Sequence, residues 1–150
     1  MKKFVIYLLI LFPITMIAED QLLMKWQFVK SESAEMPATG WQEVEVPHDW
    51  AIYGPFEKKN DLQVVQVVQN GETEATEKTG RSGGLPWMGY AWYKTTIDIP
   101  ATPREHYSLL FDSAMSNAVV YIDGKEVGGW PYGYNSFHFN VTDYLTPGTH

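Results

Sequence analysis

Hydrophobic and polar residues alternate with a period of two along much of the chain after residue 18. In the first alternating stretch, one face of a strand would carry Leu22, Met24, Trp26 and Phe28. Similar alternation recurs in residues 43–46, 91–99, 107–111 and 137–142, and residues 119–122 are a β-branched and aromatic run. This period is typical of half-buried β-strands. Because no amphipathic helix interrupts these segments, we predict an all-β fold, an antiparallel β-sandwich.

Two features refine that prediction. Asp123-Gly124 follows the β-branched and aromatic run 119–122 and predicts a two-residue β-hairpin, with residues 125–128 as the return strand. The bulky aromatic residues within or beside strands are expected to fill the core: Trp26, Trp41, Trp92 and Phe111. The last residues, Thr146 to His150, are predicted to form a turn. A sandwich would place a further strand after this turn, so we expect the last strand to be truncated and the chain to be a fragment of a longer protein.

The first 18 residues predict a secretory signal peptide. Lys2 and Lys3 precede an uncharged run from Phe4 to Ala18, and acidic residues follow it. The run is shorter than the roughly 20 residues that a membrane-spanning helix needs. The alternative is a buried N-terminal helix. With a signal peptide at 1–18, residues 19–150 form one domain that is secreted or periplasmic.

A long irregular passage extends from Pro47 to Met88, and a loop of this length favours a functional role. Within it, residues 80–84 match the nucleophile-elbow pattern G-x-S-x-G. That motif needs a buried strand before it and a helix after it. Here a charged segment precedes the glycines and Leu85-Pro86 follows them, so we interpret residues 80–84 as a glycine loop.

Charge and composition restrict the chemistry. The formal net charge of −7 disfavours nucleic acid and, once the signal peptide is removed, anionic membranes. The chain has no cysteine, and its four histidines lack metal-ligand spacing. His48-Asp49 could supply two ligands, but a structural loop role is favoured. The acidic residues look like solvated charges rather than a catalytic pair. We therefore predict no catalytic residue, no metal site and no cofactor in this segment.

Aromatic side chains in Gly/Pro-rich loops point to carbohydrate. Aromatic rings stack on the apolar faces of sugars, while neighbouring polar groups bond the hydroxyls. The candidate substrate-binding residues are Trp87, Trp130, Tyr132 and Asn135. The alternative is that these aromatic residues belong to the core.

The segment Trp41 to Trp50, WQEVEVPHDW, resembles an early signature of the glycoside hydrolase family 2 enzymes. Further segments look like the same family, in order: 61–63, 69–72, 79–86, 92–94, 111–112, 120–125, 127–128, 132–134, 137 and 141–145. The resemblance covers residues 26–150. Within the family, these segments are most similar to those of secreted β-galactosidases. It implies the N-terminal jelly-roll, or sugar-binding, domain of a multi-domain enzyme.

In such enzymes an immunoglobulin-like domain and a (β/α)8 barrel follow, and the barrel carries both catalytic glutamates. The resemblance therefore implies a retaining glycosidase whose catalytic glutamates lie outside this segment. Its partners would be a β-galactoside substrate and the downstream domains of the same chain. Some relatives place an Asp where this chain has Tyr132. Alternatives are a β-glucuronidase or β-mannosidase of the family, a free-standing carbohydrate-binding or adhesion module, or a non-functional truncation product.

Overall fold

The computed structural model describes residues 19–60, 64–65, 76–77 and 85–150 of the 150-residue chain. The predicted signal peptide at 1–18 and the glycine loop at 80–84 lie outside the described residues. Within them the fold is all-β. Its only helical segments are short 3-10 turns, at Trp50–Tyr53, Lys58–Asn60 and Thr142–Tyr144. None of these described turns has the length or hydrophobicity to cross a bilayer.

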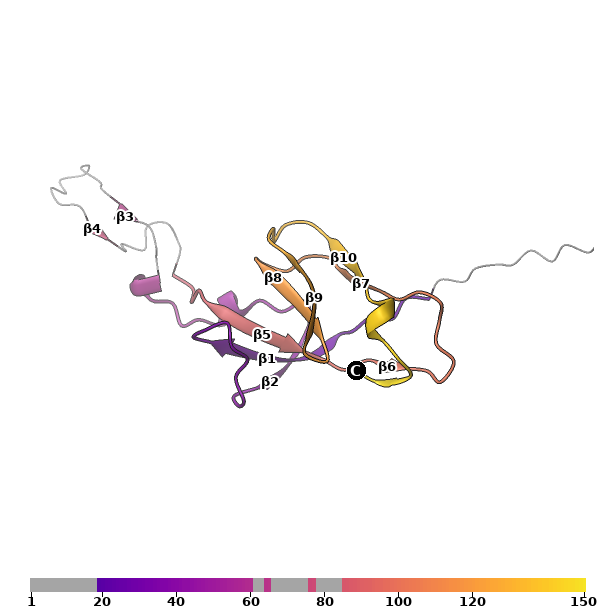
Figure 1. Cartoon of the computed structure of the whole chain (residues 1–150). Coiled ribbons are helices and arrows are strands. Elements are labelled where there is room, and N and C mark those ends of the chain that lie inside the picture. Colours follow the sequence, from indigo (N-terminus) through magenta and orange to yellow (C-terminus); the bar gives the residue numbers. More distant parts are fainter. Residues whose placement is uncertain (1–18, 61–63, 66–75, 78–84) are drawn as a thin grey trace, which may run out of the picture.

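A three-stranded sheet forms one part of the molecule (Figure 1). Its central strand β1 (Lys25–Ser31) pairs with β2 (Gln42–Glu45) on one side and β5 (Tyr90–Lys94) on the other. Both pairings are antiparallel, with Phe28 opposite Gln42 and Tyr93. Two strands that are about 60 residues apart in sequence thus become neighbours, which brings the Pro47 to Met88 passage back to the sheet it leaves.

The remaining strands pair in twos, also antiparallel. They are β7 (Ser108–Phe111) with β10 (Phe137–Asn140), β8 (Ala118–Ile122) with β9 (Lys125–Trp130), β6 (Asp98–Ile99) with β11 (Gly148–Thr149), and β3 (Val64–Val65) with β4 (Thr76–Glu77). Trp92 of β5 contacts Tyr121 of β8, with ring centroids 5.6 Å apart. These pairings confirm the predicted antiparallel β-sandwich.

The predicted hairpin is present between β8 and β9. Asp123 and Gly124 have φ angles of 50° and 76°, the left-handed values that a two-residue type I′ turn requires. Ile122 and Lys125 pair on either side of the turn, and the register shifts once, between Val120 and Tyr121. The turn therefore sets the register of the residue pairs next to it, as far as the shift at Val120.

The core has two centres. Ile99, Ile122, Val141 and Leu145 form one buried cluster, against which Leu109, Val127 and Phe139 pack. Phe28 and Val29 of β1 are buried at the three-stranded sheet, and Phe137 is buried in β10. The predicted core aromatics are only half-buried: Trp26, Trp41, Trp92 and Phe111. Their size explains the difference, since a large ring at the margin of a small sandwich keeps one edge in water.

Two predicted boundaries are wrong. The stretch 91–99 divides into β5 and β6, because the Thr95 hydroxyl donates to the Lys25 carbonyl oxygen (2.8 Å) and Ile97 then pairs with His150 instead of β1. The predicted turn at the carboxyl end contains strand β11, which pairs with β6.

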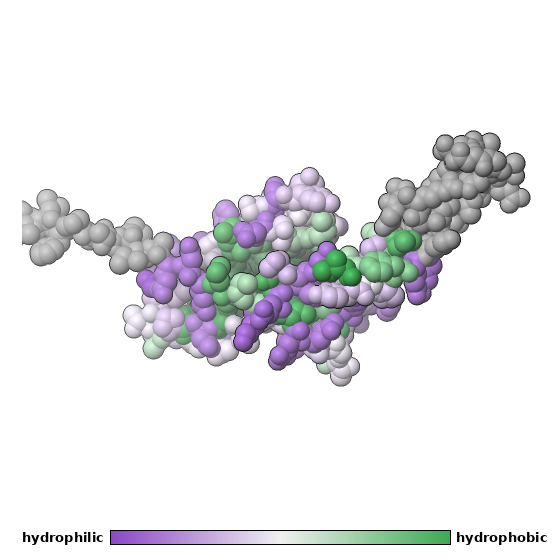
Figure 2. Space-filling model, turned by 180° about the vertical axis from the view of Figure 1, so that it is seen from behind, coloured by the Kyte–Doolittle hydropathy of each residue, from purple (hydrophilic) through white to green (hydrophobic). Residues whose placement is uncertain are grey.

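On the face seen in Figure 2, hydrophobic residues reach the surface in separate groups among hydrophilic ones.

Candidate functional site

Three of the four predicted substrate-binding residues lie in one place. Trp130 ends β9, and Tyr132 and Asn135 follow in the connection to β10. The indole Nε1–H of Trp130 donates to Asn135 Oδ1 (3.2 Å). The Trp130 ring also stacks on Phe137, with centroids 5.7 Å apart and planes at 18°. The structure therefore brings these residues together, but it uses Trp130 and Asn135 to close the loop on itself.

Two tyrosines of this loop face solvent. Tyr132 is 57% exposed and Tyr134 is 75% exposed, and their ring centroids are 5.7 Å apart. Tyr134, two residues after Tyr132 in the same loop, was not among the four predicted substrate-binding residues. An exposed aromatic pair held on a structured loop can stack on a flat apolar face and still offer hydroxyl groups for hydrogen bonds.

Trp87 belongs to a different cluster. Its ring packs edge-on against Trp50, with centroids 5.6 Å apart, and Lys30 Nζ lies 5.1 Å from the ring centroid. Trp50 in turn contacts Phe28. Trp87 is half-buried and joins the segment before β5 to the three-stranded sheet. Its described contacts are thus those of a residue that supports the fold.

His48 and Asp49, the possible metal pair, are also occupied within the fold. A hydrogen bond joins His48 Nδ1 to the hydroxyl of Tyr93 (2.8 Å), and the His48 ring contacts Phe28. Asp49 Oδ1 accepts from the backbone N–H of Ala51 and so caps the first 3-10 turn. Burial, reinforced by the Asp49 charge, raises the pKa of Tyr93 to about 12. Among the described residues, no three His, Asp or Glu side chains gather to hold a metal ion.

The described carboxylates are almost all exposed to solvent. A carboxyl group that acts as a general acid at neutral pH needs an environment that favours its protonated form, usually burial. Asp and Glu residues of 19–60 and 85–150 are exposed, except Glu57, which is half-buried and pairs with Lys59. Exposure therefore gives these carboxyl groups no low-dielectric environment of that kind.

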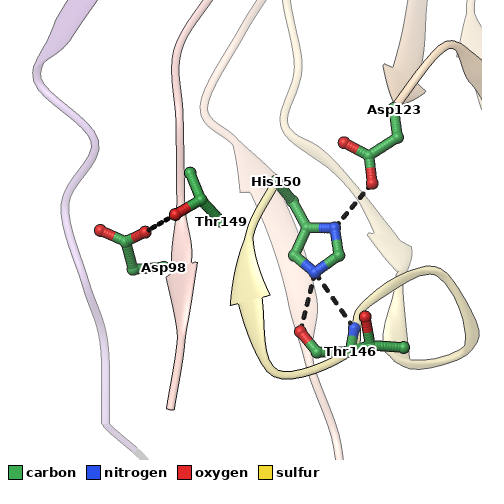
Figure 3. A network of polar contacts seen from close by, with 5 residues as sticks. All are labelled: Asp98, Asp123, Thr146, Thr149 and His150. Atoms are coloured by element: carbon green, nitrogen blue, oxygen red, sulfur yellow. Dashed lines mark hydrogen bonds and ion pairs between the residues drawn. The ribbon is translucent and has the colours of Figure 1, made fainter. Parts of the chain in front are cut away.

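A polar network at the carboxyl end links three segments (Figure 3). His150 Nδ1 lies 2.6 Å from Asp123 Oδ2, and Nε2 lies 2.7 Å from the Thr146 carbonyl oxygen. The backbone N–H and C=O of His150 both bond to Ile97 (2.9 Å each), and the Thr149 hydroxyl donates to Asp98 (2.5 Å). Sequence reasoning missed this network, since nothing in the sequence signals that positions 123 and 150 meet.

The network predicts a pH-dependent contribution to stability. The hydrogen bond to Asp123, then that to the Thr146 backbone, raises the pKa of His150 above its ordinary value of 6.5. The folded state therefore holds the proton more tightly, and the stabilisation is complete below the unfolded pKa and is lost as pH rises through the folded pKa. Asp123→Asn removes the charge, and asparagine keeps the turn conformation. We expect the difference in thermal midpoint between wild type and Asp123→Asn to be largest below pH 6.5 and to shrink at higher pH. A difference that is the same across this range would contradict the role of His150.

Comparisons with known proteins agree with the fold and the sequence motifs. No family model matches the chain. The β-galactosidase BoGH2A of Bacteroides ovatus is 29% identical over 126 residues, which are 80% of this chain and 13% of that enzyme. A putative β-glucuronidase of Formosa agariphila is also 29% identical, over 82% of this chain and 11% of its own length.

Among solved structures, a β-glycosidase from Bacteroides vulgatus matches with a TM-score of 0.56 and 28% identity. The match covers 84% of this chain and 15% of that one. The chain thus spans only about an eighth of the length of the relatives it matches. Sequence and fold together identify it as a relative of the glycoside hydrolase family 2 enzymes, which it matches over the length of one domain.

Proposed function

We propose that this chain is the N-terminal, non-catalytic domain of an exported, retaining β-galactosidase. The observation that carries the proposal is the match to BoGH2A, a named β-galactosidase, over 80% of this chain but 13% of that enzyme. The whole enzyme would hydrolyse terminal β-galactosides through a covalent glycosyl-enzyme. The exposed state of the described carboxylates supports a catalytic pair located in the rest of the longer protein.

Within that enzyme, the loop from Trp130 to Asn135 would help to shape the entrance to the sugar site. Its exposed tyrosines support this role, since the Tyr132 and Tyr134 rings are open to solvent on a structured loop. Trp87 is a weaker candidate for contacting the sugar, because its described contacts are with Trp50 and Lys30. Export through the predicted signal peptide at 1–18 is part of the same proposal.

A β-glucuronide is the second candidate substrate, because three relatives from Formosa agariphila are named as β-glucuronidases. The anionic sugar of a glucuronide calls for a cationic partner. The loop 131–136 contains no Lys or Arg, and the net charge of the chain is −7. These charges favour the neutral galactoside as far as this domain contributes to the choice.

The proposal is tested by steady-state kinetics of the full-length enzyme with chromogenic β-galactoside, β-glucuronide and β-mannoside. We expect kcat/KM to be highest for the β-galactoside. We also expect Tyr132→Ala to raise KM or lower kcat, with Leu110→Ala as a control because Leu110 is 68% exposed in β7. A higher kcat/KM for the glucuronide or mannoside would overturn the substrate assignment. Wild-type kinetics in Tyr132→Ala would remove the loop from the site.

A further inference from the structure

The loop between β9 and β10 presents its two tyrosines in a defined arrangement. Tyr132 and Tyr134 lie on either side of Gly133, and their rings are tilted at 59° with centroids 5.7 Å apart. Both rings are more than half exposed, whereas Gly133 between them is buried. The backbone thus turns inward at Gly133 while the two flanking side chains remain at the surface.

Contacts from the segment before β8 hold the loop in this shape. A Cβ at Gly133 would lie 2.5 Å from Met115 Sδ and 2.9 Å from Met115 Cα, so the glycine packs directly on the segment before β8. The backbone N–H of Asn117 donates to the Pro131 carbonyl oxygen (3.1 Å). Because these contacts already order the loop, a ligand that stacks on the tyrosines causes little further loss of conformational entropy.

Trp130 supports the loop from within. It is the outer ring of a stack that continues through Phe137 to Phe111, with planes at 18° and 13°. Phe137, in the middle, is only 5% exposed. The bond from the Trp130 indole N–H to Asn135 Oδ1 then ties the end of the loop to this stack. Trp130 and Asn135 therefore fix the tyrosines from the protein side.

The chemistry of the exposed groups defines the ligand. A tyrosine offers an apolar ring face together with a hydroxyl that donates or accepts a hydrogen bond. A pyranoside has the matching surface, an apolar C–H face bordered by hydroxyls. The loop 131–136 has no charged side chain. The chain as a whole has a formal net charge of −7, and this negative charge repels anionic polymers.

We propose that Tyr132 and Tyr134 form a stacking surface for a neutral β-linked glycan, and that Trp130 and Asn135 are its positioning residues. The choice of a neutral glycan rests on the proposed function. The inference goes beyond it, since this surface binds sugar with groups of this domain alone. Trp130 and Asn135 act through the loop and do not contact the glycan.

Affinity electrophoresis of the purified 150-residue chain tests the surface. One gel contains soluble neutral β-galactan, and a comparison gel contains the anionic polymer polygalacturonate. We expect the galactan to retard the wild type and the control Leu110→Ala equally. Tyr132→Ala and Tyr134→Ala should each weaken binding roughly fivefold to tenfold, the size of one aromatic contact. Polygalacturonate should retard none of them. Tyrosine variants that fold and bind as wild type would overturn the proposal.

The positioning role is tested separately. Trp130→Phe keeps the ring but loses the N–H donor, and Asn135→Ala loses the acceptor. We expect each to weaken galactan binding, the double variant to bind no worse than either single one, and Asn135→Asp to restore binding because its carboxylate still accepts. Additive losses, or no rescue by Asn135→Asp, would overturn this role.

Failure of the wild type to bind galactan would overturn the stacking surface. It would leave the proposed function standing, since that is decided by hydrolysis of β-galactosides by the full-length enzyme.

Discussion

Phe28→Ala is expected to lower the free energy of unfolding by about 3–5 kcal/mol, the cost of emptying a large aromatic site in a packed core. Phe28 is 1% exposed in the central strand of the three-stranded sheet. Its ring lies 4.7 Å from His48, 4.9 Å from Tyr93 and 5.8 Å from Trp50, measured between centroids. The cavity would therefore remove the surface on which the segment after β2 packs.

Urea unfolding followed by tryptophan fluorescence measures this loss. Phe28→Leu, which keeps part of the volume, should cost less than Phe28→Ala. Leu110→Ala should stay within about 0.5 kcal/mol of wild type, because Leu110 is 68% exposed. If Phe28→Ala changes stability no more than Leu110→Ala does, the packing of this sheet is not as described.

Gly128→Ala is the second large effect, expected to cost about 1–3 kcal/mol through overpacking. A Cβ at this position would lie 2.6 Å from Cε1 and 3.1 Å from Cδ1 of Phe139. Phe139 packs against the buried cluster of Ile99, Ile122, Val141 and Leu145, so its ring has little room to move. The conflict is steric: it arises where β9 crosses the ring of a residue in β10.

The matched control is Glu126→Ala, since Glu126 is exposed in the same strand. Thermal unfolding followed by circular dichroism should show a clear drop for Gly128→Ala and almost none for Glu126→Ala. Adding Phe139→Leu to Gly128→Ala should recover part of the loss by freeing space. A double variant less stable than the sum of the two single changes predicts would argue against this contact.

The fold class followed from the sequence because it depends on local pattern. Period-two alternation locates strands wherever one face is buried, and Asp123-Gly124 fixes the hairpin turn through its φ angles alone. Boundaries were less predictable, as at Thr95, where a side chain bonds to the backbone of a strand 70 residues away in sequence. Such a contact leaves no trace in the local pattern.

The candidate site was only partly predictable for the same reason. Loop composition correctly grouped Trp130, Tyr132 and Asn135, because these residues are close in sequence. It could not reveal that Asn135 Oδ1 accepts from the Trp130 indole, or that Trp87 packs on Trp50, 37 residues earlier. The sequence names residues of suitable chemistry, whereas long-range packing decides which of them remain free to meet a ligand.

We propose that this chain is a binding domain of a glycosidase whose catalytic carboxylate pair lies in the rest of the longer protein. This is tested by incubating a chromogenic β-galactoside with the purified 150-residue chain, without the rest of the longer protein. We expect this chain to release no chromophore above the rate in buffer alone. Turnover that disappears when one of the chain's own Asp or Glu residues is replaced by its amide would contradict it.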